Sequence, residues 1–65
     1  MSAEYIGETA KKMRLAKGIN QAQAATEAGV AYHTWRIMES GYVPKRGSFI
    51  AKVQKWMRDN KKYRK

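Results

Sequence analysis

The sequence predicts an all-α fold built from four short helices. Apolar residues recur at helical spacing in several segments, and no stretch alternates between apolar and polar residues for long enough to predict a strand. Four of the five glycines and the single proline lie between these helical patterns. With 65 residues and no cysteine, the chain has room for one compact domain, which must be stabilised by tight helix packing or by a partner chain and not by disulfides.

The first helix is expected over residues 3–17. Ile6, Ala10 and Met13 recur at the spacing of one helix face and form a narrow apolar stripe. Gly18 can adopt the left-handed conformation that commonly ends a helix. The first helix is therefore predicted to pack through one thin stripe, with basic residues around the rest of its surface.

Two shorter helices follow, over residues 21–28 and 31–40. Asn20 is a natural N-cap for the former, because its side-chain oxygen can accept a hydrogen bond from a free backbone amide. Gly29 ends that helix, and Gly41 ends the next. Because so few residues separate them, the two helices are expected to be joined by a tight turn.

A fourth helix is expected over residues 49–60, with Ser48 as its N-cap. Residues 61–65 are mostly basic and are expected to fray as a C-terminal tail. The sequence thus predicts one domain over residues 1–60, followed by that tail. The apolar face of the fourth helix consists of Phe49, Ile50, Val53, Trp56 and Met57.

The charge balance points to an anionic partner. Fourteen Lys and Arg stand against five Asp and Glu, which gives a net charge of +9 and a pI of about 10.2. Such a balance favours nucleic acid first and an acidic membrane surface or protein second, although excess lysine can also serve only solubility. No apolar run approaches the roughly 20 residues of a membrane span, and none resembles a signal peptide. We therefore expect a soluble, cytoplasmic protein associated with the nucleoid.

Catalysis and cofactor binding are not expected. The serines have no evident base partner, no glycine-rich phosphate loop is present, and so small a core leaves no space for a deep pocket. His33 has no second histidine and no cysteine to share a metal ion with, so no metal site is expected either.

Residues 21–40 have the pattern of a helix-turn-helix. The segment IGETAKKMRLAKGINQAQAATEAGVAYHTWRIMESG, residues 6–41, resembles the Cro and lambdoid-repressor (XRE-type) family of helix-turn-helix DNA-binding domains. The resemblance covers residues 6–50 and implies a lambda-repressor-like four-helix fold in a small phage or mobile-element regulator. The matching positions are Ile6, Gly7, Met13, Arg14, Gly18, Ile19, Asn20, Gln21, Ala25, Ala28, Gly29, Val30, Thr34, Trp35, Glu39, Gly41 and Pro44.

The chain departs from the family pattern in side-chain volume. Ala10 and Ala24 stand where the family has larger aliphatic residues, and Trp35 stands where it has a smaller one. Because protein interiors are close-packed, we expect the Trp35 indole to fill the space that the alanines leave. Ala31 replaces a frequent serine at the start of the third helix, so that N-cap is lost.

The third helix divides into an inner and an outer face. On a helical wheel Trp35 points inward, whereas Tyr32, His33, Arg36 and Ile37 lie at or beside the outer face. An exposed helix fits the DNA major groove, where Arg36 can pair with guanine and Ile37 can contact a thymine methyl. These four residues are our candidates for reading bases. Two alternatives stay open: His33 and Arg36 as plain surface residues, and Ile37 as a protein or dimer contact.

Other residues are candidates for contacts to the phosphate backbone. The family resemblance assigns this role to Asn20 and Gln21 at the start of the second helix, and a helix N-terminus is itself an anion site. Ser40, Lys45 and Arg46 follow the third helix and would meet the same backbone.

Arg14 and Glu39 occupy positions that often form an ion pair in the family, between the first helix and the end of the third. We therefore expect them to have a structural role. If the pair is buried, removal of one partner should destabilise the fold by more than the pair itself contributes.

These observations together predict a sequence-specific regulator that binds double-stranded DNA, a repressor or autoregulator of a small operon. It would bind as a symmetric homodimer to an inverted repeat, with residues 31–40 in the major groove. Tyr42 and Trp56 are candidates for the dimer interface. The alternatives are a protein-interaction module on the same fold, such as an antitoxin or antirepressor, and a non-specific nucleic-acid binder that uses the basic tail.

Overall fold

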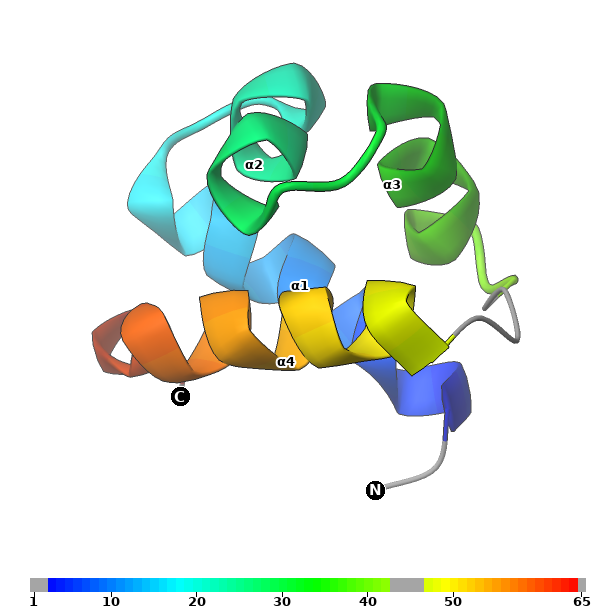
Figure 1. Cartoon of the computed structure of the whole chain (residues 1–65). Helices are drawn as coiled ribbons and strands as arrows, with labels where there is room; N and C mark the ends of the chain where they lie inside the picture. Colours follow the sequence, from blue (N-terminus) through cyan, green and yellow to red (C-terminus); the bar gives the residue numbers. More distant parts are fainter. Residues whose placement is uncertain (1–2, 43–46, 65) are drawn as a thin grey trace.

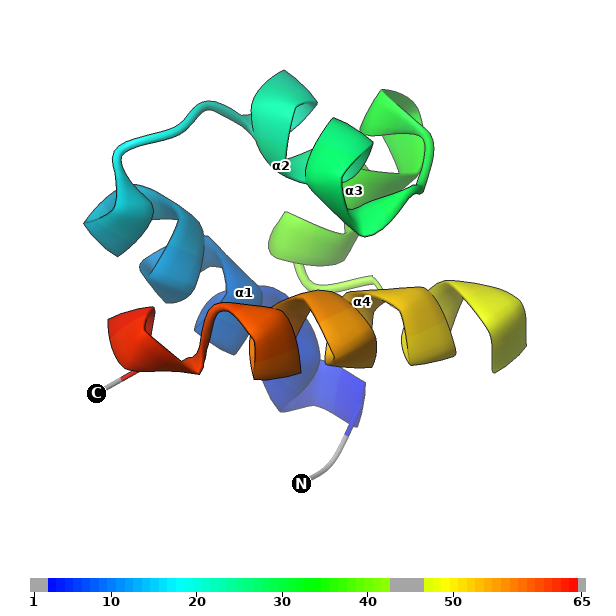
Figure 2. The same cartoon turned by 60° about the vertical axis from the view of Figure 1, so that its left-hand side comes forward.

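Helices make up almost all of the part of the chain that the computed structural model describes, residues 3–42 and 47–64. No strand occurs in these ranges, so the expected all-α class is confirmed. Figure 1 shows α2 and α3 stacked above α1 and α4, and Figure 2 shows the same arrangement turned by 60°. The elements are α1 (Ala3–Lys17), α2 (Gln21–Ala28), α3 (Tyr32–Glu39), α4 (Gly47–Asp59) and the short 3₁₀ helix η1 (Lys61–Tyr63).

The helix α1 follows its expected bounds and makes a close approach to α3 at Gly7. A Cβ atom placed on Gly7 would lie 2.0 Å from the backbone oxygen of Met38. Since no side chain fits into that space, glycine lets the two helices contact each other through their backbones. Close approach, and not turn formation, is therefore the reason for a glycine inside α1.

The helix α2 also follows its expected bounds, because both of its ends are fixed by local hydrogen bonds. The Gln23 backbone amide donates to Asn20 Oδ1 at 2.8 Å, and the Asn20 backbone amide donates to Gln23 Oε1 at 2.9 Å, which forms a capping box. Gly29 adopts a left-handed conformation at φ 77° and closes the helix, as expected. Residues 29–31 then form the short connection from α2 to α3.

The helix α3 is one residue shorter at each end than expected. Ala31 precedes it in an extended conformation and makes no side-chain capping hydrogen bond, as the loss of the serine predicted. Ser40 follows it as the C-terminal flanking residue. Neither boundary could be predicted more sharply, because neither flanking residue provides a strong cap.

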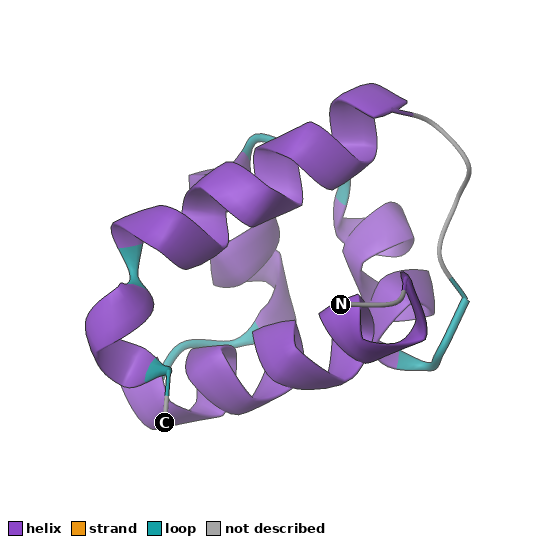
Figure 3. Ribbon diagram, turned by 90° about the horizontal axis from the view of Figure 1, so that it is seen from below, coloured by secondary structure: helices purple, strands orange, loops and turns teal. Residues whose placement is uncertain are grey.

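The C-terminal part differs from the expectation in two respects. The helix α4 begins at Gly47, so Ser48 lies inside its first turn and is not its N-cap. Lys61–Tyr63 form η1 instead of fraying, because Tyr63 packs against the core and η1 contacts α1. Figure 3 shows the lower side of the molecule, formed by α1, α4 and η1. The packed domain thus continues beyond residue 60.

The core is centred on two tryptophans. Trp35 is fully buried, and its ring meets that of Trp56 edge to face, with centroids 5.2 Å apart. Ala10 and Ala24 are also fully buried in the same cluster, and the prediction that the Trp35 indole fills the space they leave stays a prediction. Trp56 is only 3% exposed, so the expectation that it lies in a dimer interface is wrong. The core comprises Ile6, Ala10, Met13, Ala24, Ala25, Trp35, Met38, Phe49, Val53, Trp56 and Met57.

Within the described ranges, every helix is too short or too polar to cross a membrane.

Candidate nucleic-acid interface

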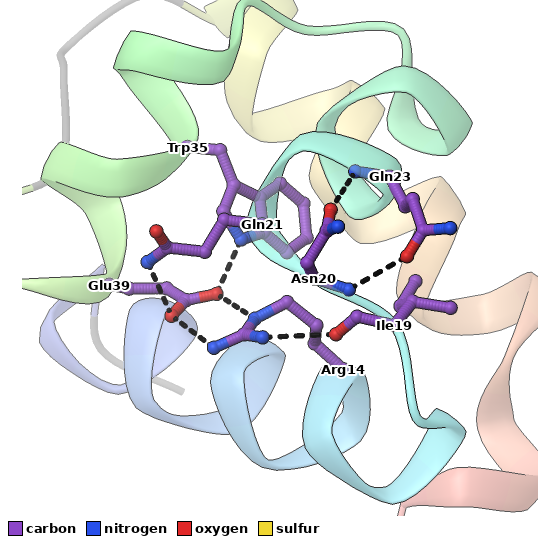
Figure 4. A network of polar contacts seen from close by, with 7 residues as sticks. All are labelled: Arg14, Ile19, Asn20, Gln21, Gln23, Trp35 and Glu39. Atoms are coloured by element: carbon purple, nitrogen blue, oxygen red, sulfur yellow. Dashed lines mark hydrogen bonds and ion pairs between the residues drawn. The ribbon is translucent and has the colours of Figure 1, made fainter.

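A buried ion pair joins α1 to the end of α3 (Figure 4). Arg14 Nε donates to Glu39 Oε2 at 2.7 Å, and Arg14 Nη2 donates to Glu39 Oε1 at 3.1 Å, so the guanidinium and carboxylate meet in a bidentate arrangement. The third guanidinium nitrogen donates to the backbone oxygen of Ile19 at 3.0 Å. The two charged side chains are only 10% and 4% exposed, as a structural role requires.

Two more donors complete the surroundings of the Glu39 carboxylate. Gln21 Nε2 donates to Oε1 at 3.1 Å, and the Trp35 indole N–H donates to Oε2. Burial by itself would raise the pKa of Glu39, but the hydrogen bonds from Arg14, Gln21 and Trp35, together with the Arg14 charge, hold it below the usual value of 4.5. The carboxylate therefore stays ionised and fully paired at neutral pH.

This network fixes the rotation of α3 about its axis. Trp35 and Glu39 lie one helical turn apart, and both are held from inside the molecule, one by the core and the other by α1 and α2. The opposite face of α3 must consequently point away from the core.

The outer face of α3 carries the base-reading candidates. Tyr32 is 48% exposed, and His33 and Arg36 are also exposed. The Arg36 guanidinium carbon lies 5.9 Å from the centre of the Tyr32 ring, which places the two side chains together on this face. Ile37 was expected to point outward but is half-buried, because it lies at the edge between the two faces.

A shallow depression of about 550 Å³ adjoins this face, where α1, the start of α2 and the end of α3 meet. Among the described residues, Lys11 and Arg36 form no ion pair with a carboxylate, while Arg14 compensates the charge of Glu39. The depression is therefore net positive and continuous with the exposed face of α3. Its lining residues are Lys11, Arg14, Gln21, Arg36, Glu39 and Ser40.

The residues predicted to contact phosphate differ in which of their polar atoms are already used in hydrogen bonds within the protein. Asn20 is exposed, but its side-chain oxygen caps α2, so only its amide nitrogen can donate outward. Gln21 is half-buried and uses its amide nitrogen on the buried carboxylate of the network. Ser40 is exposed and donates its hydroxyl to a backbone oxygen within α3 at 2.7 Å. Lys45 and Arg46 lie outside the described residues.

A second carboxylate network was not predicted from the sequence. Glu27 accepts hydrogen bonds from Lys17 Nζ at 2.6 Å and from the Trp56 indole N–H at 3.1 Å, and these bonds lower its pKa. Lys17 Nζ also donates to Asn60 Oδ1 at 2.8 Å, so α1, α2 and the end of α4 are joined. Each core tryptophan thus donates its indole N–H to a glutamate.

One of these two indole contacts had a sequence signal. Trp35 and Glu39 stand four residues apart on one helix, where side chains are neighbours. Trp56 and Glu27 are separated by 29 residues, so only the tertiary structure brings them together.

No cluster of three or more His, Cys, Asp or Glu side chains that could hold a metal ion occurs in the part of the chain with described positions. A scan against models of protein families, a search of curated proteins and a search of solved structures found no match to the chain.

Proposed function

We propose that the chain is a sequence-specific duplex-DNA-binding regulator that inserts the outer face of α3 into the major groove. The observation that carries this proposal is the division of α3 into two faces. Trp35 and Glu39 are fixed internally, whereas His33 and Arg36 project into solvent beside a positive depression. A short, rigidly held helix with polar and cationic side chains on its free face suits the reading of base edges.

The dimensions of α3 support this proposal. Eight residues make a helix about 12 Å long, and a helix with its side chains is about 10–12 Å wide, which matches a major groove of about 12 Å. The helix lies at the edge of the molecule and is open along one side (Figures 1 and 2). A duplex can therefore approach α3 without displacing another element of the described chain.

The electrostatics of this region support it as well. The net charge of +9 attracts a polyanion from any direction. Among the described residues, the depression beside α3 brings Lys11 and Arg36 together with the start of α2. A phosphate seated there would meet the positive end of the α2 dipole. We assign Lys11, Asn20 and Ser40 to backbone contacts, and Tyr32, His33 and Arg36 to the bases.

Binding as a symmetric dimer fits the size of the domain. The Cα trace measures 26 × 24 × 19 Å, whereas successive major grooves on one side of a duplex are about 34–36 Å apart. Two copies can therefore sit side by side on an inverted repeat, each with its α3 in one groove. Tyr42 is 61% exposed and follows α3, so it is the remaining candidate for the contact between copies.

The test is selection of bound duplexes from a random pool at physiological salt. The proposal predicts enrichment of an inverted repeat. It also predicts that Arg36→Ala relaxes one position in each half-site, at a cost of about 1–3 kcal/mol against the preferred base. Arg58→Ala is the matched control, because it removes the same charge from α4, away from α3. This control should keep the enriched sequence and weaken all duplexes slightly and equally.

Three results would count against the proposal. If Arg36→Ala weakens binding to all duplex sequences equally, Arg36 contacts only the phosphate backbone. If Arg58→Ala abolishes the sequence preference, α4 and not α3 contacts the bases. Absence of any enriched duplex, together with capture of a protein partner through α3, would favour the protein-interaction module.

A further inference from the structure

A second concave surface lies on α1, α4 and η1, with no contribution from α2 or α3. Its volume is about 390 Å³, within the range of about 300–1,000 Å³ that is typical of ligand pockets. Figure 3 looks onto the side of the molecule where these three elements meet. The lining residues are Ile6, Gln54, Met57, Arg58, Lys61 and Arg64. We call this surface the α4–η1 pocket.

The α4–η1 pocket combines an apolar floor with a cationic rim. Ile6 and Met57 belong to the core cluster, yet each retains a small exposed fraction at this surface, 5% and 6%. Arg58, Lys61 and Arg64 are exposed around it, and none of them forms an ion pair with a carboxylate among the described residues.

The position of these cations follows from η1. Arg58 lies in the last turn of α4, and the 3₁₀ turn over Lys61–Tyr63 brings Lys61 and Arg64 back toward α1. Tyr63 holds that turn by packing against the core. A frayed tail would not fix three positive groups around one pocket, so the pocket depends on η1.

The chemistry of the pocket selects its occupant. The three cations would bind carboxylates, which guanidinium groups contact in a planar, bidentate arrangement. The apolar floor would contact one aliphatic or aromatic side chain. A second copy of this chain is a poor occupant of this pocket, because its five Asp and Glu are scattered along the sequence and form no acidic segment. A phosphate backbone would satisfy the rim but would leave the floor uncovered.

We propose that the α4–η1 pocket docks an acidic segment of a partner protein that inserts one apolar side chain between Arg58, Lys61 and Arg64. Gln54 at the rim supplies an amide for the backbone of that segment. The apolar side chain would act as the anchor, and the carboxylates on either side of it would set orientation and association rate. This inference does not rest on DNA binding by α3, since the two surfaces share no residue.

The test is an NMR titration of the ¹⁵N-labelled full chain with a synthetic peptide that has glutamates on both sides of a single leucine. We expect amide shifts at Ile6, Met57 and Arg58 and in η1. A peptide with serine in place of leucine should bind about tenfold more weakly, because it leaves the apolar floor empty. NMR suits this test because chemical shifts detect even weak binding of a short peptide.

Charge-reversal variants can show whether the cationic residues around the pocket bind the peptide. The double variant Arg58→Glu, Arg64→Glu turns two attractions into repulsions and should weaken peptide binding by about tenfold or more. The double variant Lys52→Glu, Lys62→Glu makes the same change of charge on α4 and η1 with residues that do not line the pocket, so it should weaken binding far less. Circular dichroism verifies that both variants fold. Arg36→Ala should bind the peptide like the parent chain, which keeps this test separate from that of DNA binding.

Four outcomes would overturn the proposal. The first is a peptide that shifts none of the pocket residues. The second is equal binding of the leucine and serine peptides, which would show attraction by charge alone. The third is equal weakening by the two double variants. The fourth is a single-stranded oligonucleotide of equal charge that binds this pocket more tightly than the leucine peptide, which would assign the surface to nucleic acid.

Discussion

The two faces of α3 differ in how strongly the rest of the molecule determines them. The inner face is fixed by the core around Trp35 and by the donors around Glu39. The outer face has Tyr32 and Arg36 near each other and otherwise meets solvent. Residues on the inner face should therefore control folding, and residues on the outer face should control binding, although they alternate within eight residues of one helix.

The largest effect is expected for Trp35→Ala. Loss of a fully buried tryptophan costs about 3–5 kcal/mol, and it also leaves one donor fewer on Glu39. A domain of this size has a free energy of unfolding of roughly 3–10 kcal/mol, so the substitution removes a large share of it and should lower the urea midpoint strongly. Urea titration followed by circular dichroism measures this. His33→Ala on the outer face is the control and should change the free energy of unfolding by less than about 0.5 kcal/mol.

The next largest effect is expected for Glu39→Gln, which leaves the buried Arg14 guanidinium without a counter-charge. At pH 7 the free energy of unfolding should fall by about 3 kcal/mol, at the lower end for a broken buried pair because glutamine still accepts hydrogen bonds. Urea midpoints at neutral pH measure the loss. An unchanged midpoint would show that the ion pair does not hold α3.

The Arg14–Glu39 pair should make the free energy of unfolding depend on pH in the acidic range. The pKa of Glu39 in the folded chain lies below the ordinary value of 4.5, so its ionised form stabilises the fold above that pH, and this contribution is lost as the pH falls through the folded-state pKa. At pH values below about 4.5, the urea midpoint of the parent chain should decrease as the pH is lowered. The midpoint of Glu39→Gln should decrease less steeply. Glu27, whose pKa is also lowered by Lys17 and Trp56, adds a slope that both proteins share.

A smaller but more diagnostic effect is expected for Gly7→Ala. Helix propensity alone predicts that alanine stabilises α1 by about 1 kcal/mol. The added Cβ would lie 2.0 Å from the Met38 oxygen, and separation of two backbones should cost about 1–3 kcal/mol beyond that gain. A lower melting temperature would show that the contact dominates. A higher melting temperature would contradict the close approach of α1 to α3.

The smallest effect on stability is expected for Arg36→Ala on the outer face. Its free energy of unfolding should change by less than about 0.5 kcal/mol, while its affinity for a selected duplex should fall by about 1–3 kcal/mol. Measurement of both quantities on one preparation separates the two faces. A large loss of stability would mean that Arg36 belongs to the fold and not to the binding surface.

Local signals explain which parts of the fold the sequence predicted. The end of α1 and both ends of α2 were correct because their signals act within a few residues. Gly18 follows α1 in a left-handed conformation, the Asn20 capping box starts α2, and the left-handed Gly29 ends it. The start of α4 was wrong because Ser48 looks like an N-cap, although the helix begins before it. The helix η1 was missed because it depends on the contact of Tyr63 with the core.

The candidate site follows the same rule. The inward position of Trp35 and the pairing of Arg14 with Glu39 were expected and are present in the structure. The inward hydrogen bond of Gln21 was not expected, because it depends on how α2 lies against the end of α3. The α4–η1 pocket likewise has no signature in the sequence, since three separated elements form it.

An NMR titration can show whether DNA binds the outer face of α3. The ¹⁵N-labelled chain is titrated with the duplex that selection enriches, and the shifted amides are mapped onto the helices. If this face binds DNA, the largest shifts should occur at the start of α3, from Tyr32 to Arg36, and at the start of α2, with little change in α4 and η1. Shifts concentrated in α4 and η1, with α3 unchanged, would contradict it.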